Sequence, residues 1–174
     1  MKKIYLTLFA MFLSFNANAF VVSPHVGLDY VSTTTNGFGS FDNLNGVSLN
    51  AGVKTLAFLS VEAFYQKFKS QNALNGTNAK PESYGIDIVS DTLNLGVVEV
   101  LTSVGYAKYT LDGGNLNGKM KDFEGSAYRL GFGGQININE NLGVRAMYRY
   151  VFPDSNFLKK NAQELTIGLR YYFF

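Results

Sequence analysis

The chain has 174 residues, a length suited to one domain, and carries 15 Lys and Arg against 13 Asp and Glu. Two of the lysines stand at the extreme N-terminus, so the rest is formally neutral, which argues against a nucleic-acid partner. It contains no cysteine, which excludes disulfide scaffolds and thiolate metal sites.

The first residues have the pattern of a secretory signal peptide. Two lysines precede an apolar run from Ile4 to Phe15, and Ala17-Asn18-Ala19 has the small-x-small spacing that signal peptidase cuts after. A membrane anchor is the alternative, but about a dozen apolar residues fall short of the roughly 20 that a spanning helix needs. We therefore predict a signal peptide over residues 1–19 and one domain over residues 20–174.

No transmembrane helix is predicted after residue 19, because no apolar run there approaches about 18 residues. The composition is nevertheless unusual for a water-soluble domain, with 18 Gly, 11 Tyr and 15 Phe. A membrane protein without a spanning helix has to be a closed barrel, because an open sheet edge in lipid leaves backbone N–H and C=O groups unpaired.

Eight stretches alternate with a period of two, which is the pattern of barrel strands. In the first, Val26, Leu28 and Tyr30 share one face and Gly27 and Asp29 share the other. The fifth is less regular, because it has a leucine on the polar face and a threonine on the apolar face. The stretches are, in chain order, residues 22–30, 47–54, 59–66, 84–89, 99–107, 128–133, 143–150 and 164–173.

The connections between these stretches alternate between long and short. The long ones are polar and rich in Asn and Gly, at roughly residues 33–45, 70–82, 111–124 and 153–162. The short ones lie near residues 55–57, 93–97 and 137–141. Short periplasmic turns and longer outer loops are typical of outer-membrane barrels. We therefore predict an all-β fold, an eight-stranded antiparallel up-and-down transmembrane barrel with both termini in the periplasm.

Aromatic residues are expected to form girdles at the two membrane interfaces. The positions predicted at the outer rim are Tyr30, Tyr65, Tyr84, Tyr106, Tyr128 and Tyr150, and those at the inner rim are Tyr171 and Phe173. A soluble sandwich or a lipocalin-like barrel would share the alternation, but it has no reason to sort tyrosines by height.

Charged residues gather on the face predicted to line the lumen. All four arginines of the chain are on that face, and closure of the sheet brings their strands opposite strands rich in carboxylates. We predict a network of bidentate arginine–carboxylate pairs among Asp29, Glu62, Asp87, Asp91, Glu99, Arg129, Arg145, Arg149 and Arg170. Such a network either stabilises the interior and blocks flow, or lines a solute pathway whose gate opens by exchange of partners.

Several motifs resemble those of a known family. Leu165-x-Ile167-x-Leu169-x-Tyr171-x-Phe173 resembles the terminal strand that outer-membrane proteins present to the barrel assembly machinery. The segments at residues 24–30 and 128–133 are similar to those of the small OmpA-like and OmpX-like barrels, and the resemblance covers residues 20–174. It implies a location in the cell outer membrane, and we expect the barrel alone, without the peptidoglycan-binding domain of full-length OmpA.

Enzymes of similar architecture rely on a histidine near the membrane surface. The single histidine here, His25, falls near the periplasmic start of the first strand without a serine and carboxylate close in sequence. We therefore expect no catalytic residues, no cofactor and no metal site, and regard a lipid A-modifying enzyme as the weakest alternative.

Lysines near the outer rim are the expected contacts to lipid headgroups. Lys67 and Lys108 fall on the lipid-facing side at the outward ends of their strands, where long cationic stems reach the interface and lipopolysaccharide phosphates. Four further lysines, at positions 119, 121, 159 and 160, lie in the predicted third and fourth loops and either extend that contact, bind acidic host surfaces or are simply solvated.

These features predict a structural role in the envelope and a role in binding molecules at the cell surface. We expect a non-enzymatic outer-membrane protein that supports envelope integrity, contacts membrane lipid and lipopolysaccharide, and displays loops to host molecules or phage. A narrow porin-like pathway for solutes is the alternative.

Overall fold

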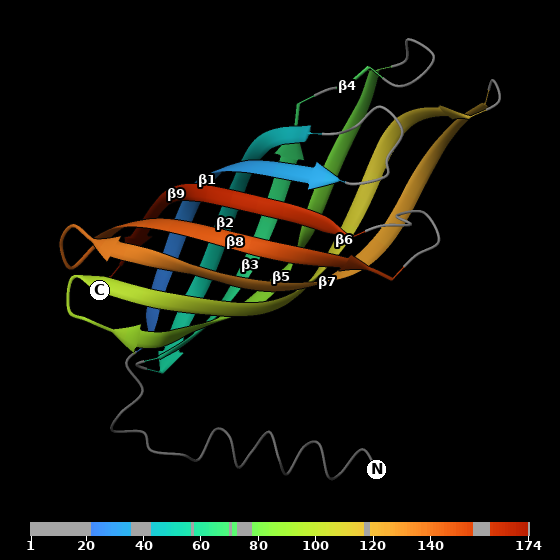
Figure 1. The fold of residues 1–174 in the computed structure, drawn as a ribbon. Helices are drawn as coiled ribbons and strands as arrows, with labels where there is room; N and C mark the ends of the chain where they lie inside the picture. Colours follow the sequence, from blue (N-terminus) through green and yellow to red (C-terminus); the bar gives the residue numbers. More distant parts are fainter. Residues whose placement is uncertain are drawn as a thin grey trace.

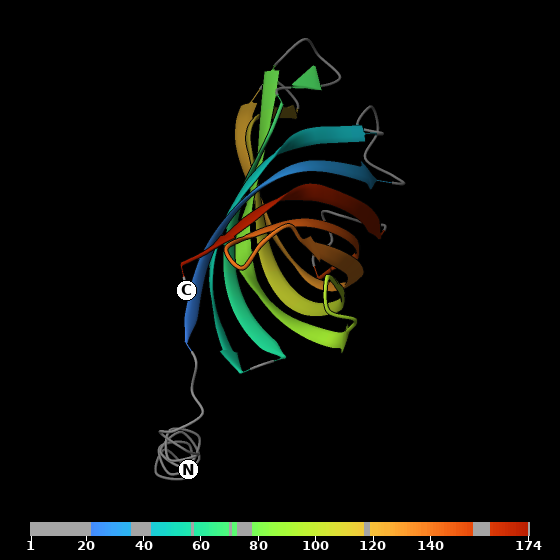
Figure 2. The same cartoon turned by 90° about the vertical axis from the view of Figure 1, so that its left-hand side faces the viewer.

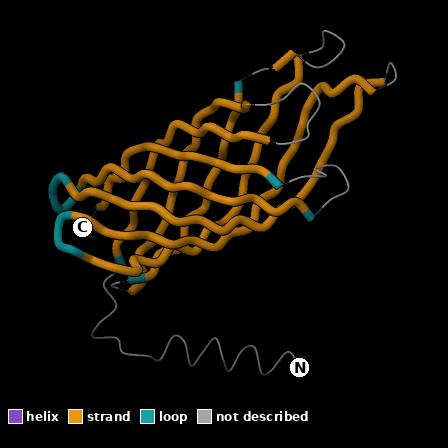
Figure 3. The backbone as a smooth tube through the Cα atoms, viewed as in Figure 1, coloured by secondary structure: helices purple, strands orange, loops and turns teal. Residues whose placement is uncertain are grey.

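The computed structural model describes residues 22–35, 43–56, 58–69, 71–72, 78–116, 119–154 and 161–173. Within these residues the chain forms nine strands and almost nothing else (Figure 3). The strands are β1 (Ser23–Thr35), β2 (Asn43–Leu56), β3 (Leu59–Phe68), β4 (Gln71–Asn72), β5 (Asn78–Asn94), β6 (Val98–Leu116), β7 (Lys119–Asn137), β8 (Leu142–Pro153) and β9 (Ala162–Tyr172).

Eight of the strands close into an antiparallel barrel (Figures 1 and 2). Strands that are consecutive in sequence pair with one another, except that β3 pairs directly with β5 and not with the two-residue β4. The ring closes where β9 pairs with β1. The short β4 contacts only the outward part of β5 and lies outside the closed ring. The predicted eight-stranded up-and-down barrel is therefore confirmed.

Short turns gather at one end of the barrel, and long hairpins gather at the other. Three short connections join β2 to β3, β5 to β6 and β7 to β8, the last two at residues 95–97 and 138–141, close to the predicted short connections. Gly96 adopts a φ of 85° in the second turn, a conformation that side chains with a Cβ rarely adopt. We call this the turn end and the opposite one the hairpin end.

Strands extend over segments that were predicted to be loops, and these predictions were wrong. The predicted loop over residues 111–124 is a β-hairpin, with β6 continuing to Leu116 and β7 starting at Lys119. The predicted loop over residues 70–82 contains β4 and the start of β5. Beyond the membrane neither face of a strand needs to be apolar, so polar sequence there pairs without the alternation that marks a spanning strand. The predicted loops at residues 33–45 and 153–162 fall largely outside the described residues.

The two faces of the sheet have the opposite character to those of a water-soluble barrel. Large apolar side chains point outward, as with Phe132, which is 63% exposed, and Leu49, which is 59% exposed. Charged side chains point inward, and Arg170 and Glu62 are 0% and 1% exposed. This inversion excludes the soluble sandwich and the lipocalin-like barrel, because an apolar outer surface of this extent requires lipid around it.

The interior is polar over most of its length, with two small apolar clusters. Val89, Leu101 and Met147 form one, and Ala127, Val151 and Ala162 form the other. Leu101 lies inside, as the irregular alternation of its strand predicted. Among the described residues, no helix has the length and apolar character needed to cross a membrane.

Candidate functional site: the lumen charge network

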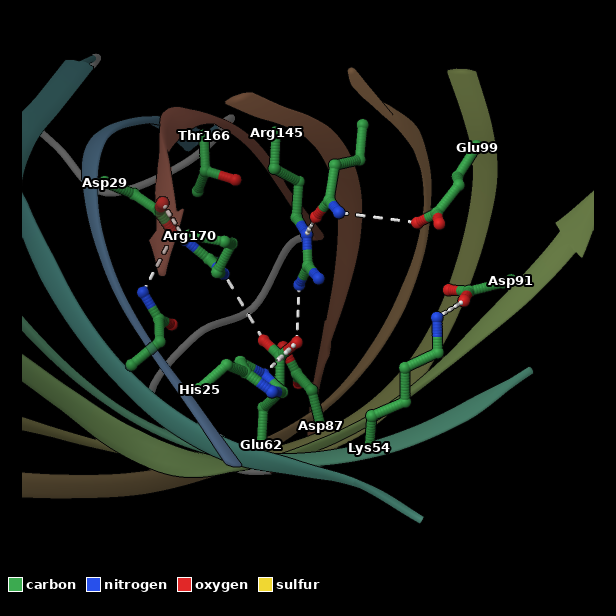
Figure 4. A network of polar contacts seen from close by, with 12 residues as sticks. His25, Asp29, Lys54, Glu62, Asp87, Asp91, Glu99, Arg145, Thr166 and Arg170 are labelled. Atoms are coloured by element: carbon green, nitrogen blue, oxygen red, sulfur yellow. Dashed lines mark hydrogen bonds and ion pairs between the residues drawn. The ribbon is translucent and has the colours of Figure 1, made fainter. Parts of the chain in front are cut away.

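Four buried arginines from three adjacent strands form the positive side of the lumen. Arg129 extends from β7, Arg145 and Arg149 from β8, and Arg170 from β9, and each is at most 3% exposed. Alternate residues of a strand share a face, so the odd-numbered positions of β8 bring Arg145 and Arg149 to the same inner surface. Figure 4 shows Arg145 and Arg170 converging with carboxylates from the other strands.

Glu62 of β3 is the central acceptor of the network. Its Oε1 accepts from Arg145 Nη1 at 2.5 Å, and its Oε2 lies 3.8 Å from Arg170 Nη2. The His25 ring contacts the same Oε1 through Nε2 at 3.0 Å and packs on Tyr172, with 5.1 Å between ring centroids. Three cationic or titratable groups therefore share one buried carboxylate.

Asp29 of β1 holds the second arginine–carboxylate pair. Its two oxygens accept from the two terminal nitrogens of Arg170 at 2.5 and 2.9 Å. Asn50 Nδ2 donates to the same carboxylate at 3.0 Å. The pair joins neighbouring strands, β1 and β9, rather than the opposite walls that were predicted for arginine–carboxylate contacts.

A third cluster lies toward the hairpin end, where two carboxylates lie between two arginines. Glu164 Oε1 accepts from Arg129 at 2.8 Å and from Arg149 at 3.4 Å. Asp87 Oδ2 lies 3.5 Å from Arg129 Nη2 and 3.3 Å from Arg149 Nε. The Arg129 guanidinium also lies 4.0 Å from the centroid of the Phe64 ring, a cation–π distance.

Polar side chains continue the network to the turn end. Glu99 accepts from Gln135 at 3.4 Å and from Asn137 at 3.1 Å, and Gln135 in turn accepts from Arg145 Nε at 3.0 Å. Asp91 is paired with Lys54 of β2 instead of an arginine. Chemically, these contacts pair the buried charges with one another, which is the condition under which charges are tolerated in so narrow a space. They leave Arg129 Nε and Nη1 and Arg170 Nε without a hydrogen-bond partner among the described residues.

The structure brings the predicted lumen residues together, but not in the predicted pattern. All nine side chains point inward, and only the Asp29–Arg170 contact uses two separate oxygen–nitrogen pairs. Glu99 has amide partners instead of an arginine. Glu164 was missing from the predicted network although it joins two of its arginines, and its position on the inner face of β9 was the available signal.

The predicted girdle residues lie on the lipid-facing surface. Tyr30, Tyr65, Tyr84, Tyr106, Tyr128, Tyr171 and Phe173 are all exposed there. Tyr150 is half-buried, and its hydroxyl accepts from Asn161 at 3.0 Å. Ring contacts join Tyr106 to Tyr128 and Tyr171 to Phe173, at 5.6 and 5.2 Å between centroids.

The two predicted headgroup lysines have different surroundings. Lys67 Nζ lies 3.6 Å from Glu82, which also accepts from the Tyr65 hydroxyl at 2.8 Å. Lys108 is exposed and borders a surface hollow lined by Tyr84 and Tyr106. The remaining lysine predictions concern Lys119, Lys121, Lys159 and Lys160, whose side chains lie outside the described part of the chain, as do residues 1–19.

Comparison with known proteins gives one family match. The outer membrane protein beta-barrel domain matches residues 6–173. No curated protein matches the chain.

Solved structures of bacterial surface barrels are similar to this fold. Neisserial surface protein A aligns with a TM-score of 0.65 and 19% identity over 87% of this chain and 97% of its own. The N-terminal barrel of Pseudomonas aeruginosa OprF aligns with a TM-score of 0.62 and 15% identity over 86% and 97%. Yersinia pestis Ail, in complex with the heparin analogue sucrose octasulfate, aligns with a TM-score of 0.58 and 15% identity over 87% and 97%.

Proposed function

Because the chain belongs to the family of outer membrane protein beta-barrel domains and lies in the cell outer membrane, we propose that it is a non-enzymatic barrel that stabilises the envelope and presents its hairpin end to molecules outside the cell. This orientation follows from the short connections at the turn end, which in outer-membrane barrels face the periplasm. The barrel assembly machinery is the expected partner during biogenesis.

The contact between Glu62 and Arg145 is the observation that carries the structural role. In the closed order of eight strands, β3 and β8 are separated by four steps in either direction, so these two side chains come from diametrically opposite walls. Their atoms meet at 2.5 Å in the middle of the lumen. A buried ion pair at this position joins the walls and obstructs a through passage, which favours a structural interior over a solute pathway.

The surroundings of His25 favour a non-enzymatic protein. Its side chain is 0% exposed and is held between Glu62 and Tyr172 inside the barrel. A histidine that acts on lipid needs access to the membrane surface, and this one has a wall of strands between it and lipid. Lipid A from cells that overproduce the protein should therefore have an unchanged mass spectrum.

The hairpin end is the proposed interaction surface. The long strands β6 and β7, together with the outward end of β5, extend beyond the ends of the other strands in Figure 1. The β6–β7 hairpin carries Lys119 and Lys121, and the predicted fourth loop carries Lys159 and Lys160. Together with Lys67 and Lys108 at the rim, these lysines suit phosphates of lipopolysaccharide or acidic host glycans. The heparin analogue bound by the similar Ail barrel motivates a sulfated glycan as the first probe.

Two measurements test this proposal. In planar bilayers the folded protein should show no steady ion conductance, whereas Arg145→Ala should raise it by removing the contact across the lumen. On immobilised heparin the protein should be retained, and replacing Lys119, Lys121, Lys159 and Lys160 with alanine should abolish retention. Steady conductance of the unaltered protein would instead support the narrow pore, and no retention would leave the surface role without support.

A further inference from the structure

A polar hollow of about 380 Å³ lies across the turn end of the lumen. Ser23 of β1 and Glu99 of β6 both line it, and these strands are four steps apart in the closed ring, so the hollow spans the mouth from one wall to the opposite wall. Other strands and two turns contribute further lining residues, among them Lys54, Val97, Glu140 and Tyr172. We call this space the turn-end hollow.

Glu99 is a buried carboxylate that lacks a cation. It is 6% exposed, and its oxygens accept from the amides of Asn137 and Gln135, at 3.1 and 3.4 Å. Within the part of the chain that the structure describes, the other buried carboxylates of the lumen each lie at ion-pair distance from an arginine. The lysine of the hollow, Lys54, is already paired with Asp91 (Figure 4). Burial of an unpaired carboxylate is costly, so the hollow is short of a positive charge.

The rest of the lining is both acidic and apolar. Glu140 is exposed, and its carboxylate forms no hydrogen bond or ion pair with another described residue. Val97 presents an apolar side chain that is 62% exposed. Two carboxylates beside an apolar surface suit a ligand that joins a positive charge to an apolar side chain.

Removal of the signal peptide would create such a ligand within reach of the hollow. Cleavage after Ala19 leaves an α-ammonium on Phe20, three residues before Ser23. Three extended residues span at most about 10 Å. Ser23 itself faces inward, with 8% of its surface exposed, so the chain enters the barrel at the wall of the hollow.

We infer that the α-ammonium of Phe20 binds in the turn-end hollow as the cation partner of Glu99, with the phenyl ring against Val97. Removal of the signal peptide then supplies the positive charge that the hollow lacks. The occupant is this chain's own terminus, because three residues tether it to the wall of the hollow and its charge and side chain match the lining. The inference rests on the predicted cleavage and not on the proposed surface role.

The pKa of the α-amine tests this contact. Protein isolated from outer membranes would be treated with an amine reagent over a range of pH, and modification of the N-terminal peptide measured by mass spectrometry. A free α-amine has a pKa of about 7.7–8.0, and a carboxylate in contact should raise it by about one unit or more. Glu99→Gln should return it to the ordinary range. Glu82→Gln, which removes a carboxylate at the hairpin end, should leave it raised.

The groups that face the hollow decide the direction of this shift. Lys54 would lower the pKa of the α-amine, but its charge is offset by Asp91. Glu99 and Glu140 both raise it, and the Tyr172 hydroxyl is a neutral group that donates to Gln135. Faster migration of each unboiled variant on a gel would show that it has folded.

A carbodiimide gives a second reading, because it links an amine to a carboxylate only where the two are in contact. It should link Phe20 N to Glu99 in the unaltered protein. Deleting Phe20 and Val21 keeps Glu99 intact but leaves an α-ammonium that reaches only about 3 Å beyond Ser23, so the link and the raised pKa should both disappear.

Three outcomes would overturn the inference. One is an ordinary pKa for the α-amine of the cleaved protein together with no link to Glu99. Another is a precursor mass for the isolated protein, since Phe20 would then have no α-ammonium. The third is an ordinary pKa with binding of spermidine that Glu99→Gln abolishes, which would assign the hollow to a soluble cation. None of these measurements depends on conductance or on heparin, so they are independent of the proposed function.

Discussion

Arg170 and Asp29 form their ion pair across a glycine on each strand. In the β1–β9 register, Arg170 stands opposite Gly27, and Asp29 stands opposite Gly168. A Cβ built at Gly27 would overlap the arginine side chain, and one at Gly168 would overlap Asp29. The two missing side chains allow the guanidinium to lie along the wall and reach both carboxylate oxygens at 2.5 and 2.9 Å.

Gly27→Ala should therefore destabilise the barrel by about 1–3 kcal/mol, the usual cost of overpacking a close-packed site. The measurement is denaturant unfolding of the refolded protein in lipid vesicles. Gly134→Ala is the matched control, because a Cβ there would meet only the Glu99 carbonyl oxygen, at an ordinary 3.4 Å. Equal effects of the two substitutions would contradict the role assigned to Gly27.

Glu62→Gln tests the central acceptor of the network. It would leave Arg145 and Arg170 buried without their shared charge, and losing one member of a buried ion pair costs about 3–5 kcal/mol. Glu82→Gln removes a carboxylate from the exposed contact with Lys67 and should cost less than about 1 kcal/mol. The free energies of unfolding of the two variants should thus differ several-fold, and similar values would show that the lumen charges are well solvated.

The period of the sequence was enough to predict which side chains face the lumen. Alternation is a local property of a strand, so Asp29, Asp87 and Arg145 could be assigned to one face without knowing which strands are neighbours. The partners could not be assigned in the same way, because they depend on the stagger between strands. That stagger places Arg170 beside Asp29 on the neighbouring strand and Arg145 against Glu62 on the opposite wall.

Strand ends were harder to predict than strand centres. Gly113, Gly114 and Asn115 have the composition of a turn, yet β6 continues through them. Lipid imposes alternation only where a strand crosses it, and beyond that region pairing depends on the backbone alone. The same limit applies at the turn end, where the exposed residues Leu95 and Val97 flank Gly96 in a connection that was predicted only to be short.

A charge placed on the outer face should cost energy according to its depth. Phe132→Arg, in mid-belt, should destabilise the barrel by about 2–4 kcal/mol, whereas Tyr128→Arg, four residues nearer the rim on the same strand, should cost about 0–1 kcal/mol. Each substitution removes one ring contact, to Tyr148 and to Tyr106 respectively, so that loss is matched. Reversible denaturant unfolding of the two variants in lipid vesicles measures both free energies of unfolding. Equal costs would mean that Tyr128 lies deeper than the interface.

Export should remove the first 19 residues. The small-x-small pattern predicts cleavage after Ala19, so that the protein isolated from outer membranes begins at Phe20. Intact-mass measurement checks this, and Ala19→Arg should leave the uncleaved precursor because the site requires a small side chain. A precursor mass for the unaltered protein would instead support a retained anchor.

Closure of the barrel depends on the seam between β1 and β9, which joins the two ends of the spanning sheet. The seam pairs His25 through Thr35 with Tyr172 through Ala162, and loss of β9 would expose the backbone edges of β1 and β8 to lipid. Deleting residues 162–174 should therefore abolish the fast-migrating form seen on gels without boiling. Deleting residues 113–118 at the tip of the β6–β7 hairpin should preserve that form, because the ring closes below it. If the tip deletion also abolished the fast-migrating form, the hairpin would have to take part in closure.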